Sequence, residues 1–126
     1  MMKNDLLQIM VYDHRKISSV KEEFNTIFPY LKLEFFLKPN LPNSASSLKF
    51  LKYDSKTLGE FKEHDKEIEI CIIPSMTVEK LNQKFHDTYG LGVLVYRKSG
   101  KVWLETTLTQ DWTLEEQNKQ GEELSN

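Results

Sequence analysis

The sequence predicts an α+β fold: one pseudo-symmetric domain over residues 1–126, made of two strand-helix-strand-strand-helix repeats, with about six strands and four helices. Three observations predict it. Apolar residues recur at helical spacing in some segments and alternate in others. The second half of the chain repeats the apolar skeleton of the first. Residues that favour turns separate these segments. A single sheet with helices on one face and an appended acidic tail is the alternative architecture.

The first repeat covers about residues 5–65 and begins with an apolar run that predicts a strand over 6–12. Apolar residues then recur every three or four positions from Ile17 to Phe28, which indicates a helix, and Pro29 ends it. Ser19 and Glu22 resemble a capping box at its start. The remaining elements are an alternating strand over 31–37, a loop insertion rich in Pro, Asn and Ser over 38–47, a strand over 48–53 and a short helix over 57–63.

The second repeat covers about residues 67–124 and follows the same order. Alternating isoleucines predict a strand over 68–72, and an apolar stripe from Val78 to Tyr89 predicts a helix that Gly90 caps. A hairpin follows over 91–106, with its turn at Lys98-Ser99-Gly100. The final helix, 113–124, has few apolar residues, so we expect only slight contact with the core.

The case for a repeat is the coincidence of apolar positions in the two halves. A shift of 61 residues places apolar side chains on apolar side chains at Ile9 and Ile70, Val11 and Ile72, Ile17 and Val78, Val20 and Leu81, Phe24 and Phe85, and Phe28 and Tyr89. Further along, Thr57 with Glu60 and Thr113 with Glu116 both read as capping boxes, at a shift of 56. The insertion at 38–47 accounts for the smaller second shift.

Composition excludes several classes of protein. The 126 residues carry a formal net charge of −2, and 39% of them are hydrophobic. This apolar content argues against a disordered chain, and near-neutral charge argues against a dedicated nucleic-acid binder. One cysteine excludes an internal disulfide framework. No apolar run approaches the length of a membrane span, and the run at 6–12 lacks a cleavage site, so we expect a cytoplasmic protein without membrane association.

No arrangement of catalytic or ligand residues stands out. His14, His64 and His86 lack the spacing of a metal site, and Cys71 lies within a predicted buried strand. No glycine-rich phosphate loop is present. We therefore predict no catalytic residue, cofactor or metal, and an enzyme is the less favoured reading.

The hairpin over 91–106 carries the strongest functional signal because both of its faces are apolar. Either helices cover both faces, or one face is exposed and binds a partner. The candidate partner-binding residues are Tyr96, Arg97, Lys98, Trp103, Asp111 and Trp112.

We consider three functions, of which two use this hairpin and the third uses the interface of the repeats. The first is a non-enzymatic interaction or small regulatory module that binds an unidentified protein or a second copy of itself. The second is single-stranded nucleic-acid binding, since basic residues alternate with aromatic residues in the hairpin. The third is an enzyme with a site at the interface of the repeats, where Asp13, His14 and the turn at 74–77 would converge.

The last third of the chain also resembles a family of small conserved bacterial proteins of unassigned function. The residues that carry the resemblance are Tyr89-Gly90-Leu91, Val95 to Gly100, Val102-Trp103-Leu104-Glu105 and Asp111-Trp112-Thr113-Leu114-Glu115. The resemblance implies a bacterial protein with the hairpin-then-helix arrangement, and it implies no activity.

Overall fold

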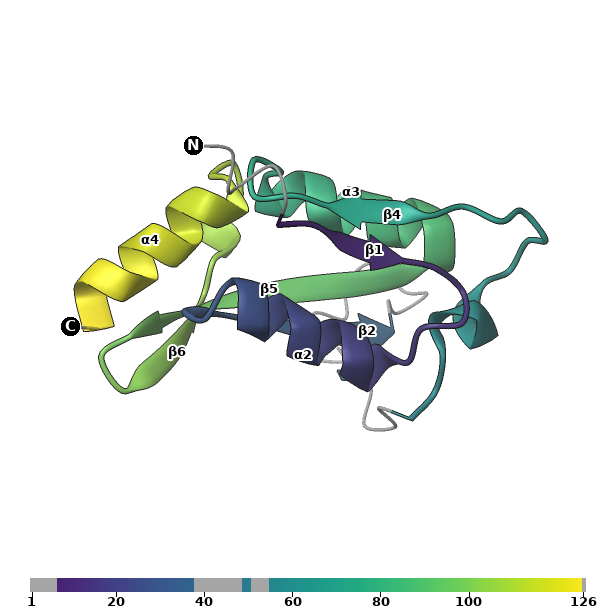
Figure 1. Cartoon of the computed structure of the whole chain (residues 1–126), viewed down its shortest axis with the longest axis horizontal. Coiled ribbons are helices and arrows are strands. Elements are labelled where there is room, and N and C mark those ends of the chain that lie inside the picture. The colour runs from purple at the N-terminus through teal and green to yellow at the C-terminus, as the bar shows by residue number, and fades with distance from the viewer. Residues whose placement is uncertain (1–6, 38–48, 51–54, 126) are drawn as a thin grey trace.

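Figure 1 presents the computed structural model of the chain, which describes residues 7–37, 49–50 and 55–125. The predicted loop insertion at 38–47 and most of the predicted strand at 48–53 lie outside the described residues. In chain order the elements are β1 (Ile9–Val11), α2 (Ile17–Ile27), β2 (Leu31–Leu37), β3 (Lys49–Phe50), the 3-10 helix η2 (Leu58–Phe61), β4 (Ile70–Ile72), α3 (Val78–Tyr89), β5 (Leu91–Ser99), β6 (Val102–Glu105), the 3-10 helix η3 (Thr107–Thr109) and α4 (Leu114–Ser125).

The fold is α+β, with two antiparallel sheets. β1 and β4 form a two-stranded ladder in which Met10 pairs with Cys71. The larger sheet has the order β3-β2-β5-β6, and its longest ladder joins β2 to β5 with Glu34 opposite Leu94. Both ladders therefore pair a strand from the first half of the chain with one from the second half.

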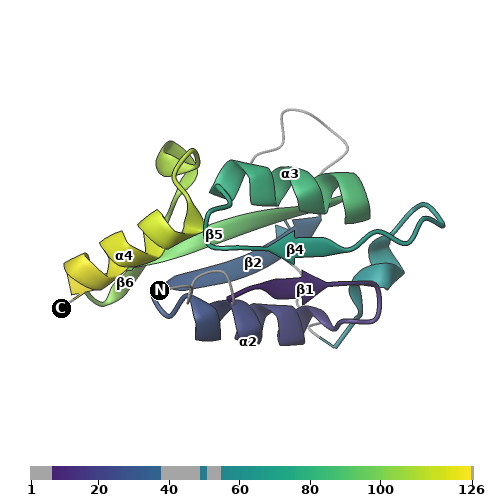
Figure 2. The same cartoon turned by 45° about the horizontal axis from the view of Figure 1, so that its top comes forward.

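The core lies between the larger sheet and a layer formed by α2, the β1–β4 ladder and α3. These three elements lie side by side over one face of the sheet, and α4 lies beyond them at the hairpin end (Figures 1 and 2). Alternate residues of β2 and β5 point into this layer and are fully or almost fully buried: Leu31, Leu33, Phe35, Leu91, Val93 and Val95. We call this side of the sheet the helix face and the opposite side the outer face.

The predicted helices over 17–28 and 78–89 are both present, and their caps differ. Thr77 caps α3 by accepting from the Lys80 N–H at 3.1 Å, and Gly90 ends it with a φ of 68°. The capping box predicted at Ser19 is wrong. Ser19 lies inside α2, whose N-cap is Lys16, and its hydroxyl accepts from Arg15 Nη2 at 2.7 Å.

The described residues contain three α-helices where the sequence predicted four. The helix expected over 57–63 is a single 3-10 turn, η2, although the Thr57 N–H does donate to the Glu60 carboxylate at 2.8 Å. The turn stops early because the chain leaves helical geometry at Lys62, which has a ψ of 134°. Its side chain instead contacts Asp13.

The hairpin turn is also displaced from its predicted position. Lys98 and Ser99 belong to β5, and the two-residue loop is Gly100-Lys101. Gly100 has a φ of 62° and no other hairpin residue has a positive φ, which fits a turn with glycine at its first central position.

None of the helices in residues 7–37 and 55–125 combines the length and the apolar character that crossing a bilayer requires.

Candidate functional site

The six predicted binding residues do not share one surface, because the strand pleat divides the four in the hairpin and the other two lie in the turn before α4. Tyr96 and Lys98 point to the outer face, as does Trp103, which is the cross-strand partner of Lys98. Arg97 points to the helix face, where Trp112 lies. Asp111 is exposed in the turn before α4.

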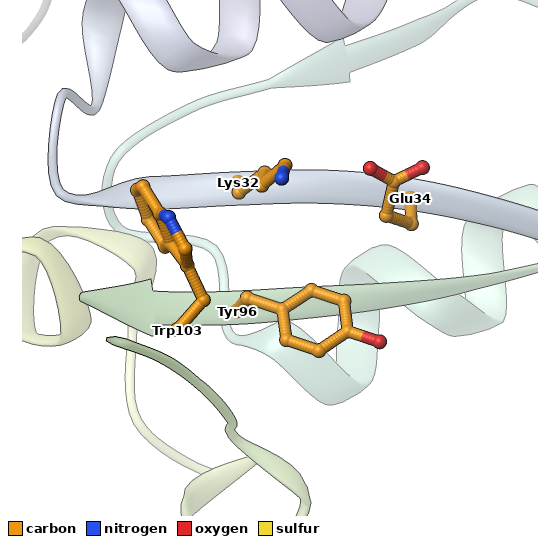
Figure 3. A pocket seen from close by; sticks show the side chains of 4 residues that line it. All are labelled: Lys32, Glu34, Tyr96 and Trp103. Atoms are coloured by element: carbon orange, nitrogen blue, oxygen red, sulfur yellow. The ribbon is translucent and has the colours of Figure 1, made fainter. Parts of the chain in front are cut away.

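The outer face holds a pocket of about 260 Å³ lined by Lys32, Glu34, Tyr96 and Trp103. Figure 3 shows the Trp103 ring reaching from the hairpin across β5 toward Lys32 on β2. The Lys32 ammonium lies 5.7 Å from the centre of this ring, within the range of a cation–π contact. Two aromatic walls and two opposite charges therefore face one depression.

A second pocket of about 260 Å³ adjoins the first, since Lys32 and Trp103 line both. Its other wall is the exposed side of α2, with Lys21, Glu22 and Asn25. Lys21 Nζ forms an ion pair with Glu34 at 2.9 Å, which ties α2 to the rim of the first pocket. We call the two pockets together the Trp103 groove.

The charges around the Trp103 groove nearly balance. Burial raises the pKa of Tyr96 above its usual value, and the neighbouring carboxylates of Glu105 and Glu34 raise it further. A tyrosine phenol is neutral at physiological pH even without this shift, and as a neutral group it can donate or accept a hydrogen bond. With Lys32 and Lys98 on the same face, neither sign of charge dominates.

The Arg97 side chain contacts α4 and the residue before its N-cap, and it does not reach the outer face. Its guanidinium lies 5.5 Å from the centre of the Trp112 ring and donates to Gln117 Oε1 at 2.8 Å. Gln117 is fully buried, and its amide donates to the Thr109 carbonyl at 2.7 Å. The expectation of slight core contact for α4 was therefore incomplete. Leu114 anchors the helix to the core, and the buried polar contacts of Gln117 anchor it further.

The two turns proposed to converge in an enzyme site lie at opposite ends of the β1–β4 ladder. Val11, which precedes the first turn, pairs with Ile70 at the start of β4, whereas Ile72, which precedes the second, pairs with Ile9. Asp13 and His14 therefore do not meet the turn at 74–77, and the proposed convergence is wrong. Antiparallel pairing of the two strands is the physical reason.

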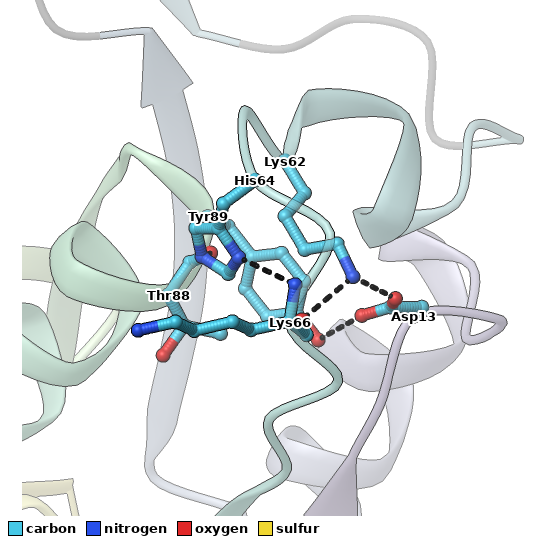
Figure 4. Close-up of polar contacts among 6 residues, drawn as sticks. All are labelled: Asp13, Lys62, His64, Lys66, Thr88 and Tyr89. Carbon is cyan, nitrogen blue, oxygen red and sulfur yellow. Dashed lines mark hydrogen bonds and ion pairs between the residues drawn. The ribbon is translucent and has the colours of Figure 1, made fainter.

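Asp13 instead joins a polar cluster with Lys62 and Tyr89, shown in Figure 4. Its carboxylate accepts from Lys62 Nζ at 2.5 Å and from the Tyr89 hydroxyl at 3.2 Å. The hydrogen bond from Lys62 is the main cause that lowers the Asp13 pKa. Burial and the adjacent carboxylate raise the pKa of Tyr89 well above its usual range.

This cluster extends through His64. Its Nδ1 accepts from the Lys66 N–H at 3.2 Å, and its Nε2 lies 3.0 Å from the Thr88 carbonyl oxygen, so this geometry assigns the proton to Nε2. A pocket of about 240 Å³ beside Asp13 is lined by Tyr12, His14 and residues 67–69. The cluster ties the turn after β1 and the loop after η2 to the C-terminal end of α3, and its polar groups satisfy one another.

The other two histidines and the cysteine have different surroundings. Cys71 lies in the middle of β4, half-buried, and its thiol lies 3.2 Å from Gln8 Oε1. His14 and His86 are exposed. Within the residues that the structure describes, no three side chains of the histidine, cysteine or acidic type are placed to hold a metal ion.

Sequence reasoning missed Lys32 and Glu34 as site residues. The alternation of β2 already placed both on its polar side, but only the neighbouring position of β2 and β5 brings them to Tyr96. It also missed the Asp13–Lys62–Tyr89 cluster, whose members come from three separate segments of the chain and share no local motif.

Comparison of the chain with protein-family models, with curated proteins and with solved structures finds no match in any of the three. The resemblance to small bacterial proteins therefore stays a prediction.

Proposed function

We propose that this protein is a non-enzymatic interaction module that binds a segment of a partner protein in the Trp103 groove. The observation that carries the proposal is the pocket between Tyr96 and Trp103, which combines aromatic walls with one cation and one anion. Aromatic side chains in a concave, partly desolvated site are the usual anchors of protein interfaces.

The balance of charge favours a peptide over a nucleic acid. A single-stranded nucleic acid requires a positive path for its phosphates beside the stacking rings. Here Glu34 and Glu105 lie next to Tyr96, and an anionic backbone would be repelled by both. A peptide that carries both signs of charge and an apolar anchor suits the groove better.

The proposal is tested by selecting binders from a displayed peptide library on the full chain and measuring their affinity for variants. We expect Trp103→Ala to weaken binding of the selected peptides at least tenfold, since it removes the wall common to both pockets. Asp111→Ala, in the exposed turn before α4, is the matched control and should bind as the unaltered chain does. Equal unfolding midpoints for the three proteins would show that the fold is unchanged.

Labelled single-stranded oligonucleotides form the second arm of this experiment. Binding that falls steeply with salt, and that both Lys98→Glu and Trp103→Ala weaken, would replace the proposal with nucleic-acid binding. If Trp103→Ala leaves the affinity for the peptides unchanged, the peptides bind at another site and the proposal is refuted.

We also propose that the domain consists of two related halves. The central pair of the small ladder, Met10 with Cys71, is separated by 61 positions, and the central pair of the large ladder, Glu34 with Leu94, by 60. Two isolated bridges, Lys16 with Thr57 and Thr77 with Thr113, follow the same correspondence. These relations support a two-fold axis between the halves.

An experimental structure would test this relation. The segments 9–36 and 70–96 should superpose on each other by a half-turn about an axis between the two ladders. A rotation far from a half-turn would contradict the duplication. For the compartment, we propose cytoplasmic residence, which the unpaired thiol of Cys71 suits.

A further inference from the structure

Strand β6 forms one edge of the larger sheet, and its exposed residues are unusual for an edge. The order β3-β2-β5-β6 leaves its outer side without a neighbouring strand among the described residues, as Figure 1 illustrates. Val102 is 55% exposed and Leu104 44% exposed on the helix face, while Trp103 is half-buried on the outer face. Natural edge strands are commonly protected by charge, proline or a bulge, because an unprotected edge pairs with another strand.

The hydrogen-bonding pattern of the hairpin determines which main-chain N–H and C=O groups of β6 point outward at this edge. A two-residue loop makes Ser99 and Val102 its closing hydrogen-bonded pair, and such pairs alternate along the ladder. The Lys98–Trp103 pair is then not hydrogen-bonded. The Lys98 N–H indeed donates in the opposite direction, to the Tyr30 carbonyl at 2.9 Å. The N–H and C=O groups of Trp103 and Glu105 therefore point away from the sheet.

We propose that this edge binds a second copy of the chain by antiparallel β6–β6 pairing, with Trp103 opposite Trp103 of the second copy. This register makes Trp103 a hydrogen-bonded pair with its counterpart, since its main-chain groups face outward in both copies. It also places Val102 opposite Leu104 of the second copy, so that apolar side chains cover each other on the helix face.

Charge complementarity favours a second copy of the chain as the binding partner, and it favours the register centred on Trp103. Lys101, the loop residue just before β6, and Glu105, the last residue of β6, lie two residues to either side of Trp103, and both are exposed. Antiparallel pairing centred on Trp103 brings Lys101, at the hairpin tip of each copy, beside Glu105 of the other, which allows two identical ion pairs related by a two-fold axis. A shift of the register by two residues in either direction would lose both ion pairs. A hairpin edge whose two charges complement each other in this way fits a second copy of itself.

The pairing has a structural consequence for the Trp103 groove. Cross-strand partners point to the same side of a sheet, so the dimer would present both outer faces on one side of a continuous sheet. The two Trp103 side chains would be neighbours at its centre. This inference goes beyond the proposed function and does not depend on it, because a monomer and a dimer could each bind a peptide.

The experiment measures the mass of the full chain by sedimentation equilibrium across a range of concentrations. We expect a reversible dimer for the unaltered protein. Glu105→Lys and Lys101→Glu each place like charges opposite each other twice, and each should raise the dimer dissociation constant about tenfold or more. An equimolar mixture of the two variants should restore association, because a mixed pair carries both ion pairs again. Glu122→Lys, an exposed change on α4, is the control for net charge.

Amide exchange gives a readout that does not rely on charge. The Trp103 and Glu105 amide protons should become protected as the dimer forms and stay exchangeable in the two single variants. A monomer at every concentration would overturn the proposal. So would a dimer that Glu105→Lys, Lys101→Glu and their mixture leave equally stable, since that dimer must use another surface.

Discussion

The ring of Phe36 lies against Gly92 on the outer face of the sheet. The two residues are cross-strand partners in β2 and β5, and a Cβ atom at Gly92 would lie only 2.3 Å from Phe36 Cζ. The glycine leaves the space that the ring fills, and the ring covers a strand position that has no side chain of its own.

Gly92→Ala should therefore destabilise the protein by about 1–3 kcal/mol, because the ring must leave its position to admit the methyl group. Chemical denaturation measures the change in the free energy of unfolding. In a Phe36→Ala background the same substitution meets no ring, and its cost should largely disappear. A Gly92→Ala cost that persists unchanged in that background would show that the strain has another source.

Gly121→Ala should loosen α4 even though alanine favours helices. A Cβ atom there would lie 2.8 Å from Tyr30 Cβ and 3.2 Å from Arg97 Cγ, so the helix must move away from the sheet. We expect a loss of about 1–3 kcal/mol in the free energy of unfolding. Glu122→Ala, the next and exposed position, is the control and should change stability by less than about 0.5 kcal/mol. A stabilised Gly121→Ala would mean that α4 tolerates displacement.

The acid stability of the protein should depend on Asp13. Lys62 lowers the pKa of this carboxyl in the fold, so its contribution is fully present above the ordinary Asp pKa of about 3.9 and is lost as the pH falls through the lower folded value. Asp13→Asn should unfold more easily at neutral pH and lose less further stability on acidification. Unfolding midpoints at several pH values measure this. Asp111→Asn, at an exposed site, should keep the pH profile of the unaltered protein.

Tyr89 should contribute to the loss of folding stability at alkaline pH. Its pKa is raised by burial and by the Asp13 carboxylate, so the fold favours the neutral phenol. Stability should fall as the pH rises past the ordinary Tyr pKa of about 10, since only the unfolded chain ionises readily there. Tyr89→Phe should lose about 1 kcal/mol near neutral pH and show a shallower alkaline decline. Tyr12→Phe, at an exposed position, should decline as steeply as the unaltered chain.

Local patterns in the sequence were sufficient for much of the fold. The apolar stripe ending at Gly90 predicted α3 closely, and the alternation in 31–37 predicted β2. These features depend on neighbours within a few residues, where periodicity and capping act directly. The helix predicted over 57–63 is reduced to the 3-10 turn η2, because Lys62 leaves helical geometry and contacts Asp13, 49 positions away.

Only part of the candidate site could be predicted from the sequence, again because the rest depends on contacts between distant segments. Residue type identified Tyr96 and Trp103, but grouping Arg97 with them ignored the alternation that turns it toward Gln117. Lys32 joined the site only once β2 was known to lie beside β5. Strand order depends on pairing between distant segments, which no short pattern in the sequence specifies.

The pairing of strands across the two halves also sets when this chain can fold. During synthesis from the N-terminus, β1 and β2 are made long before their partners β4 and β5. The small ladder cannot close before Ile72 has been added and the large one cannot close before Arg97 has been added, so much of the core must wait until most of the chain has been made. Contacts of such long sequence separation slow folding, and we expect exposed strands in the nascent chain to need protection until then.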